Sequence, residues 1–206
     1  PLNLIAADLW GPAPHDSSLG HRYYLSLVDA YSRYTWIFFL KSKSETSSIV
    51  KQFITLVEKQ FNHSVKKFQS DGGKEFSPLR DFFQEKGIFH RMTCPHTSEQ
   101  NGLVERKHRH IVDTDLTLMS QASMPMKYWS DAFYTSVYLI NRMPTKILKD
   151  MCPYEKLYGI KPNYHFLKTF GCLCFPYLRP YNRHKLSLRS SPCTFLGYTN
   201  NQKGYK

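Results

Sequence analysis

The sequence predicts an α/β protein in which helices pack on a mixed five-stranded sheet, followed by a smaller basic segment of helices and strands. Three observations lead to this class. Short runs rich in β-branched and aromatic residues recur along the first half of the chain, and longer runs with apolar residues every three or four positions alternate with them. The 206 residues are 41% hydrophobic and 15% aromatic, which is enough apolar side chain for a packed core.

The first part of the chain predicts a strand, a β-hairpin and then a helix. Residues 2–9 are apolar, and a Gly–Pro–Ala–Pro break soon follows them, which stops a strand. Residues 22–29 and 33–40 are rich in Tyr, Val, Ile, Phe and Trp, and only a short Ala–Tyr–Ser link separates them. In residues 44–61 the apolar positions recur at three and four residues, as on the buried face of an amphipathic helix.

The next part predicts alternating strands and helices. The expected elements are strands at 65–69 and 88–92 and helices at 79–86, 102–122 and 126–141. Gly87 stops the first of these helices at its C-terminal side. Hairpin strands followed by alternating strands and helices imply a mixed sheet with helices packed on it.

Prolines and glycines become frequent from Pro144 onward, and two further strands are expected at 170–178 and 193–198. We therefore expect a core domain at residues 1–122, a helical extension at 123–168 and a basic, β-containing segment at 169–206. Because the chain begins at Pro1 rather than at Met, we expect it to be a segment of a longer polypeptide.

Charge and cysteine content narrow the functional classes. Residues 122–206 carry 13 of the 28 Lys and Arg but only 3 of the 16 Asp and Glu, so most of the net +12 lies there. Such asymmetry favours a polyanion such as nucleic acid, and a solubilising surface is the alternative. Five cysteines without a CxxC pair indicate neither a disulfide framework nor a structural zinc site. The densest apolar run, Trp36–Leu40, is far too short to span a membrane.

Three acids stand at the ends of expected elements and could hold metal. Asp8 ends the first strand, Asp71 follows the fourth, and Glu105 lies in the first turn of the long helix. If strands one and four are neighbours, the two aspartates lie side by side, and a crossing helix can bring the glutamate to them. Phosphodiester chemistry often uses two divalent cations, which prefer carboxylate oxygens.

Ordinary structural roles are the alternative for each acid. Asp8 could be a solvated strand end, Asp71 could belong to a turn with the two glycines after it, and Glu105 could be a first-turn glutamate. Asp29 and Glu75 also remain possible ligands on spacing alone.

Four stretches resemble the integrase core of copia-type long-terminal-repeat retrotransposons: Asp8–Pro12, Val28–Arg33, Ser70–Phe76 and Gln100–Lys107. The resemblance implies a ribonuclease H-like fold and an Asp–Asp–Glu catalytic triad at Asp8, Asp71 and Glu105. It extends past the core through Pro153–Gly159, Phe170–Cys172, Phe195–Tyr198 and Lys203–Tyr205, which resemble the segment after the core in copia-type polyproteins.

This family uses two Mg²⁺ ions, with Mn²⁺ as a substitute, and the resemblance therefore implies metal-dependent 3′-end processing and strand transfer of element DNA. A catalytically decayed or non-catalytic DNA-binding module and a purely hydrolytic ribonuclease H-like nuclease are the alternatives. The expected partners are double-stranded DNA, as element ends and target, and further copies of the chain. The mature enzyme is expected in the nucleus, after an earlier stage in a cytoplasmic particle.

DNA contacts are expected around the triad and in the basic C-terminal segment. The resemblance implies that Gln100 and Asn101 touch DNA ends from a flexible loop, while Asn101 can also serve as a helix N-cap. Basic side chains after the catalytic glutamate can grip phosphates, or can simply be solvated. With aromatic neighbours, the later basic stretch suits nucleic acid, and a basic linker is the alternative. The candidate cations are Arg106, Lys107, Arg109, Arg183 and Lys185.

Overall fold

The computed structural model describes residues 1–93, 101–181, 184, 186–199 and 204–206. Its main feature is a five-stranded sheet in the order β3-β2-β1-β4-β5. The hairpin strands run antiparallel to β1, whereas β4 and β5 run parallel to it, so the predicted mixed sheet is confirmed. The strands are β1 Leu4–Trp10, β2 Tyr23–Asp29, β3 Thr35–Leu40, β4 Lys67–Ser70 and β5 Phe89–Met92.

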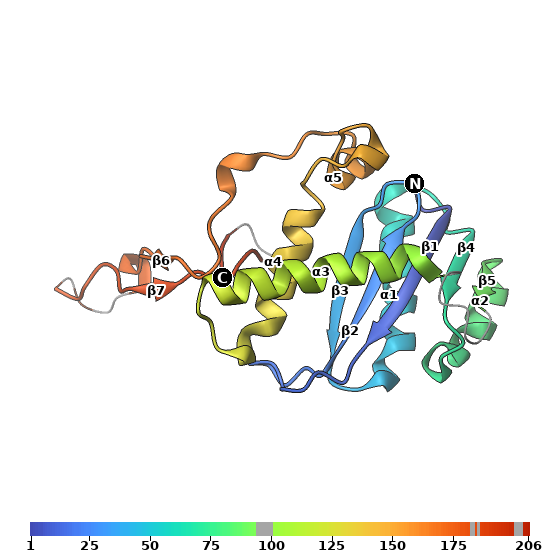
Figure 1. Cartoon of the computed structure of the whole chain (residues 1–206), viewed down its shortest axis with the longest axis horizontal. Helices are drawn as coiled ribbons and strands as arrows, with labels where there is room; N and C mark the ends of the chain where they lie inside the picture. The colour runs from blue at the N-terminus through green and yellow to red at the C-terminus, as the bar shows by residue number, and fades with distance from the viewer. Residues whose placement is uncertain (94–100, 182–183, 185, 200–203) are drawn as a thin grey trace.

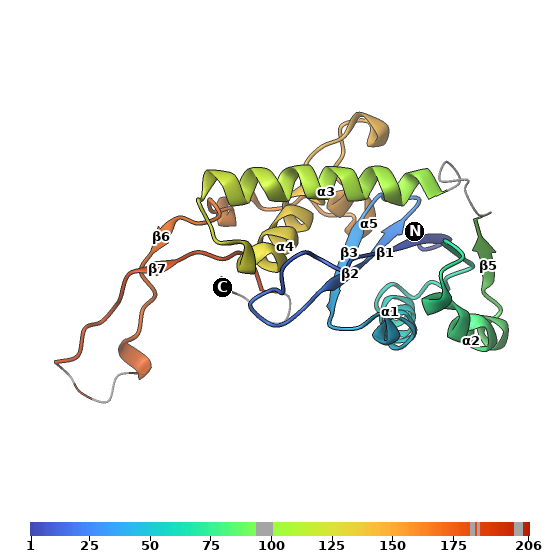
Figure 2. The same ribbon diagram turned by 60° about the horizontal axis from the view of Figure 1, so that its bottom comes forward.

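Helices cover both faces of this sheet. Figure 2 shows α3 and α4 on one face and α1 and α2 on the other. These helices are α1 Thr46–Phe61, α2 Arg80–Lys86, α3 Gly102–Gln121 and α4 Trp129–Ile140, close to the predicted bounds. Short 3-10 turns lie at Lys43–Glu45 (η1), Lys74–Leu79 (η2), Met126–Tyr128 (η4), Lys146–Leu148 (η5), Tyr164–Phe166 (η6) and Arg179–Tyr181 (η7).

Each face of the sheet has its own apolar core. Beneath α1 and α2, residues such as Leu25, Phe53 and Phe68 are almost fully buried. Beneath α3 and α4 the core includes Tyr24 and Phe133. Burying one such large side chain contributes about 1.5–3 kcal/mol, so the two cores together fix the helices on the sheet.

The pleat of β1 determines which residues face α3. Ile5 and Ala7 belong to the core under α1, whereas Ala6 packs with Val104 of α3. Because side chains alternate across a strand, Asp8 points to the same face as Ala6. The sheet therefore presents Asp8 beneath α3, which runs across the strands on this face (Figure 1).

The segment after α4 departs from the sequence prediction in two places. A short helix that was not predicted, α5 Pro153–Tyr158, begins with Pro in its first turn and ends at Gly159 in the left-handed conformation. The strands expected at 170–178 and 193–198 were too long. The two-stranded ladder consists of β6 Leu173–Cys174 and β7 Cys193–Thr194, and Pro176 and Pro192, which cannot donate to a ladder, lie next to it on the side of the intervening residues. Tyr198, at the end of the second expected strand, forms an isolated antiparallel bridge with Tyr205.

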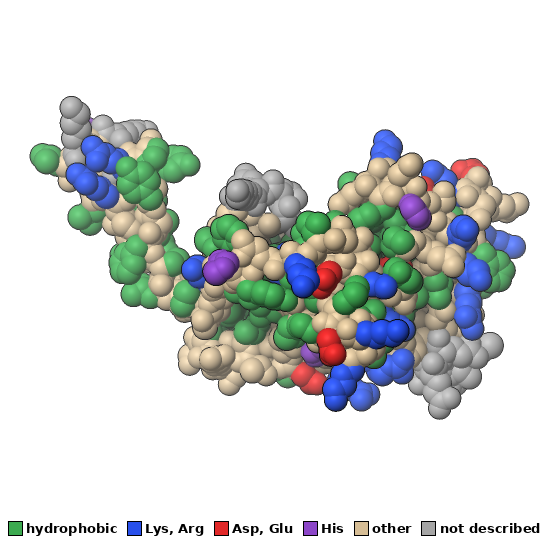
Figure 3. All heavy atoms as spheres, turned by 90° about the horizontal axis from the view of Figure 1, so that it is seen from above, with side chains coloured by type: hydrophobic (Ala, Val, Ile, Leu, Met, Phe, Trp, Pro, Cys, Tyr) green, Lys and Arg blue, Asp and Glu red, His purple; other side chains and the backbone are tan. Residues whose placement is uncertain are grey.

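Together with β6 and β7, the described residues of the stretch 173–194 (173–181, 184 and 186–194) form an arm that extends away from the body (Figure 2). Its described side chains are mostly exposed, and hydrophobic and basic groups lie together on it (Figure 3). α4 shares its core with α3 and the sheet. The domain boundaries after residues 122 and 168 stay predictions. No helix in the described part of the chain is both long and apolar enough to cross a bilayer.

Candidate active site

The pairing of β1 with β4 places Asp8 and Asp71 side by side. The Cα partners run in parallel from Leu4 with Lys67 to Ala6 with Gln69. Two further steps along both chains reach Asp8 and Asp71, the latter just beyond the last residue of β4. Because two steps preserve the face of a strand, both aspartates lie on the α3 side of the sheet. The predicted neighbourhood of strands one and four is therefore confirmed.

Asn101 fixes the start of α3 over these two strands. Its side-chain amide donates to the carbonyl of Ala7 at 3.3 Å, and its Oδ1 accepts from Nε2 of Gln69 at 3.4 Å. Asn101 occupies the N-cap position of α3, as one of the two readings predicted, but its side chain makes no capping hydrogen bond. The helix therefore begins directly above β1 and β4, and Glu105 follows one turn later.

The three acids share one electrostatic neighbourhood. Burial raises the pKa of Asp8 to about 6, and the negative charges of Asp71 and Glu105 act in the same direction. None of the three makes an ion pair with Lys or Arg within the described residues, although the chain carries net charge +12. A buried carboxylate beside like charges is stabilised most readily by a cation from outside the chain.

The chemistry of these side chains fits a hard divalent cation. All three offer carboxylate oxygens, and Asp71 is exposed, with Oδ1 accepting only a 3.3 Å hydrogen bond from the Gly73 amide among the described contacts. Mg²⁺ typically takes one or two carboxylates together with water and substrate phosphate. The described residues contain no ready-made group of three His, Cys, Asp or Glu side chains around one point.

The two other acids behave differently. Asp29 is completely buried, and its carboxylate accepts from the amides of Leu2 and Ser32 and from the Ser32 hydroxyl, so it ties the β2–β3 turn to the N-terminus. Glu75 lies in η2, and its Oε1 is 4.0 Å from Nζ of Lys43. Its charge also raises the pKa of Asp8, by less than the charges of Asp71 and Glu105 do. Asp29 is therefore structural, and Glu75 lies at the margin of the acidic group.

Sequence reasoning missed three residues where α3 packs on the sheet: two lie on β2 and one lies on α3 itself. Ser26 lies opposite Asp8 on β2, and its hydroxyl donates to the Asp8 carbonyl at 3.4 Å. Tyr24, two residues earlier, is fully buried and is hydrogen-bonded through its hydroxyl to Nδ1 of His108 on α3. The sequence feature that could have indicated this contact is His108, which lies one turn after Glu105 on a helix face whose other residues are mostly apolar.

The predicted DNA contacts remain predictions. Arg106 and Arg109 are exposed on α3, while burial, and then the positive charge of Arg33, lower the pKa of Lys107 to about 8. Asn101 is only 4% exposed and uses its amide within the protein. Gln100, Arg183 and Lys185 lie outside the described residues.

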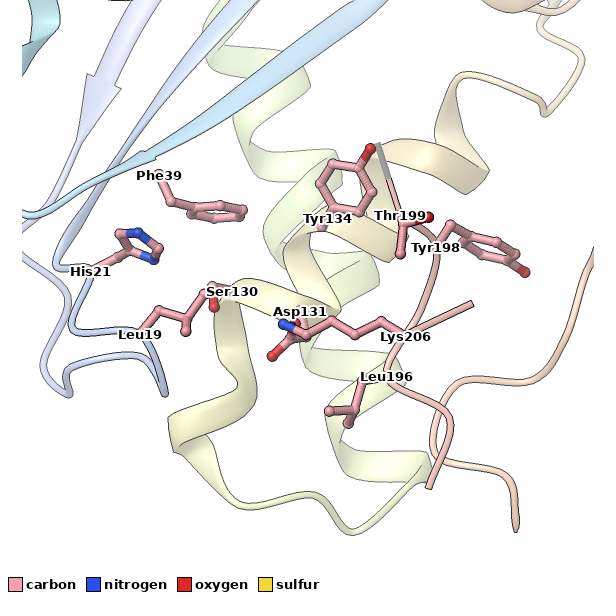
Figure 4. Close-up of a pocket in the computed structure, with 10 residues that line it drawn as sticks. All are labelled: Leu19, His21, Phe39, Ser130, Asp131, Tyr134, Leu196, Tyr198, Thr199 and Lys206. Atoms are coloured by element: carbon pink, nitrogen blue, oxygen red, sulfur yellow. The ribbon is translucent and has the colours of Figure 1, made fainter. Parts of the chain in front are cut away.

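The acids lie apart from a cavity of about 460 Å³ between α4, the turn before β2 and the C-terminal residues. Figure 4 shows Lys206 pointing its amine at Asp131 inside this cavity, with His21 and Phe39 on the opposite wall. None of the three acids lines it. The candidate site lies instead at the ends of β1 and β4 beneath the start of α3, where Asp71 and Glu105 are exposed.

Two family models match the chain. Residues 1–98 match the integrase core domain, and residues 172–206 match the retroviral polymerase SH3-like domain. Among curated proteins, the retrovirus-related Pol polyproteins from transposons RE1 and RE2 of Arabidopsis thaliana are each 49% identical over all of this chain. The corresponding polyprotein from transposon TNT 1-94 of Nicotiana tabacum is 33% identical. The chain spans only 14% to 16% of the length of these relatives.

Solved structures show the same fold. The catalytic core domain of BIV integrase aligns with 77% of this chain and 95% of its own, with a TM-score of 0.54 and 17% identity. A chain of the simian T-cell lymphotropic virus intasome, solved in complex with PP2A regulatory subunit B56 gamma, aligns with 95% of this chain and 69% of its own, with a TM-score of 0.61 and 16% identity. The chain therefore contains an integrase core domain followed by a retroviral SH3-like segment, and it is homologous to the corresponding part of copia-type Pol polyproteins.

Proposed function

We propose that this chain is the catalytic part of a retrotransposon integrase, which processes the 3′ ends of element DNA and joins them to target DNA. Asp8, Asp71 and Glu105 are the proposed catalytic residues and the ligands of two Mg²⁺ ions, for which Mn²⁺ can substitute. One observation carries the proposal: the parallel pairing of β1 with β4 and the start of α3 gather Asp8, Asp71 and Glu105. Burial, and then the charges of Asp71 and Glu105, raise the pKa of Asp8, and none of the three acids forms an ion pair within the described residues.

The proposed reaction has two steps of the same kind. In the first, water attacks a phosphodiester near the 3′ end, so that one P–O bond forms, one breaks and a 3′-hydroxyl is released. In the second, that hydroxyl attacks a target phosphodiester and the target strand end leaves. Asp8, Asp71 and Glu105 would hold the divalent cations, which would supply activation of the attacking oxygen and stabilisation of the leaving one. No protein side chain serves as the nucleophile.

The chain's own residues supply position and charge. Asp8 is held in the middle of the sheet face by β1, and Asp71 approaches from the end of β4, where it is exposed to substrate. Glu105 comes from above, on the first turn of α3. Exposed Arg106 and Arg109 follow on the same helix, where they can contact the phosphates of DNA and so orient it without reading its sequence.

The proposed partners are double-stranded DNA and further copies of the chain. The basic arm, residues 173–194, would add phosphate contacts away from the acids. Because two element ends must reach one target, we propose that the active form is a multimer. The mature enzyme would act in the nucleus and would reside earlier in a cytoplasmic particle.

A joining assay on linear and branched DNA tests this function. The chain and its Glu105→Gln variant are incubated with labelled element ends and target DNA in Mg²⁺ and in Mn²⁺. Joined products from the chain and none from the variant support the proposal. Shortened ends without joined products in any condition would indicate a hydrolytic nuclease, and salt-sensitive DNA binding without either product would indicate a non-catalytic module.

A further inference from the structure

We propose that Tyr24 and His108 form a positioning pair that holds Glu105 in place over Asp8. This inference rests on the proposed function of the three acids. Tyr24 lies on β2 directly opposite Trp10, two residues past Asp8 on β1. His108 lies on α3, three residues past Glu105, and its Nδ1 is hydrogen-bonded to the Tyr24 hydroxyl.

The pair lies in a close aromatic stack. The rings of Tyr24 and His108 are nearly parallel, with centroids 5.7 Å apart and an interplanar angle of 17°. Trp10 lies 5.3 Å from Tyr24 and 6.0 Å from His108, and Phe133 of α4 lies 4.9 Å from Tyr24. Tyr24 is 0% exposed. Its position is therefore set by residues from β1, α3 and α4 at once.

The hydrogen bond between Tyr24 and His108 constrains the orientation of α3 on the sheet more tightly than apolar packing does. Apolar contacts tolerate small rotations of a helix. A buried hydroxyl loses its hydration, and this destabilises the fold unless one particular hydrogen-bond partner lies within bonding distance. Burial raises the pKa of Tyr24 and lowers that of His108, so both groups are neutral at ordinary pH. A neutral pair can form this bond in either direction: the Tyr24 hydroxyl donates to a bare Nδ1, or a protonated Nδ1 donates to the hydroxyl oxygen.

The pair is one of two polar anchors that flank Glu105. Four residues before it, Asn101 is hydrogen-bonded to β1 and β4 through Ala7 and Gln69. Three residues after it, His108 is hydrogen-bonded to β2. The two anchors attach the first turns of α3 to three different strands. Glu105 is exposed between them, so its placement over Asp8 depends on the helix rather than on its own contacts.

Four variants of the 206-residue chain separate positioning from packing. Tyr24→Phe keeps the ring and removes only the hydroxyl. His108→Phe keeps an aromatic ring and removes the hydrogen-bonding nitrogen, while His108→Asn offers an amide group near the place of Nδ1. His110→Phe, on the exposed side of the same helix, is the matched control. For each we would measure Mn²⁺ binding from the free-ion EPR signal, the joining rate, DNA affinity and the melting temperature in EDTA.

We expect Tyr24→Phe and His108→Phe to bind Mn²⁺ about ten-fold more weakly, with DNA affinity unchanged. This is the size of loss found when a residue that hydrogen-bonds to a metal ligand is removed. His108→Asn should recover most of this loss, and the Tyr24→Phe/His108→Phe double variant should be no worse than either single one. Mn²⁺ affinity within two-fold of the parent in Tyr24→Phe would overturn the proposal, as would a His108→Asn variant no better than His108→Phe. Tyr24→Phe decides the matter if His108→Phe does not fold.

Failure of the proposed function would look different. If Glu105→Gln joins DNA and binds Mn²⁺ like the parent, the acids are not the metal site and the pair has nothing to position. If Glu105→Gln is inactive and binds Mn²⁺ weakly while Tyr24→Phe behaves like the parent, only the positioning role is lost.

Discussion

Asp8 on β1 lies beside Asp71, one residue past the end of β4, because the two strands pair in parallel, although 62 residues lie between them in the chain. The register of β1 with β4 alone brings them together, and the helix that starts at Gly102 adds the third acid from above. Because no Lys or Arg among the described residues forms an ion pair with these acids, the net charge of the group should depend on bound metal and on pH.

Replacement of Asp8 by Asn should stabilise the metal-free protein at neutral pH. The pKa of Asp8 is raised to about 6 in the folded chain, so stability is lost as pH rises from about 4 through about 6. Two pKa units correspond to at most about 3 kcal/mol. Melting curves in EDTA at pH 7 should therefore shift upward in Asp8→Asn.

Added Mg²⁺ should reverse this order, because metal binding stabilises only a folded chain that can hold the ion. The parent melting temperature should rise with Mg²⁺, and that of Asp8→Asn should not. Asp113→Asn, an exposed acid on α3, should respond like the parent. An equal response of Asp8→Asn and the parent to Mg²⁺ would remove Asp8 from the metal site.

Asp115 should make stability depend on pH over a wider range. It is 2% exposed on α3, its Oδ1 has no hydrogen-bond partner, and burial raises its pKa to about 8. The contribution of the Asp115 carboxyl to the free energy of unfolding is fully present below about pH 4 and is lost as pH rises through about 8. Urea unfolding of Asp115→Asn should lack that decline, which is on the order of 2–4 kcal/mol between pH 5 and pH 8. An unchanged slope would show that the carboxyl is already hydrated.

Removal of the Asn101 anchor should reduce joining more than it reduces stability. Asn101→Ala deletes the hydrogen bonds to Ala7 and Gln69, which should cost about 1–3 kcal/mol because these groups are buried. The start of α3 would then shift relative to β1 and β4, and joined product should fall at least ten-fold. Asn163→Ala, which removes the N-cap hydrogen bond of η6, is the control that should lose stability without losing product at matched folding.

Exposed arginines on α3 should contribute to DNA affinity through phosphate contacts. Arg106→Ala and Arg109→Ala should each lower the slope of log affinity against log salt by about 1, with little change between DNA sequences. Arg80→Ala on α2, on the opposite face of the sheet, should leave the slope unchanged. Fluorescence anisotropy over a salt series measures this, and identical slopes in all three variants would remove α3 from the DNA-binding surface.

The order of the main strands and helices could be predicted from sequence because each has a strong local signal. The apolar positions of residues 44–61 recur with the helical period, and α1 begins at Thr46 and ends at Phe61. The meeting of Asp8 and Asp71 followed from one topological assumption, that strands one and four are neighbours. The register confirms that assumption.

The remaining details depend on partners that are distant in sequence. Nothing near Tyr24 indicates that its hydroxyl will reach His108, because only the packing of α3 on β2 brings them together. Asn101 was expected to cap a helix or touch DNA; it occupies the N-cap position, but its amide forms hydrogen bonds with Ala7 and Gln69 rather than with the helix, and its contact with DNA stays a prediction. In the C-terminal segment, aromatic and β-branched residues favoured long strands, while Pro176 and Pro192 lie next to a ladder of only two residue pairs, Leu173 with Thr194 and Cys174 with Cys193.

The most direct test of the central claim compares Asp71→Asn with Asp81→Asn in the same joining and DNA-binding assays. Both remove one exposed carboxylate, but Asp81 lies on α2, on the opposite face of the sheet from α3. We predict that Asp71→Asn forms no joined or shortened product in Mg²⁺ or Mn²⁺ while it binds DNA with unchanged salt dependence, and that Asp81→Asn retains full activity. Joined product from Asp71→Asn at the rate of Asp81→Asn would contradict the assignment of Asp8, Asp71 and Glu105 as the catalytic group.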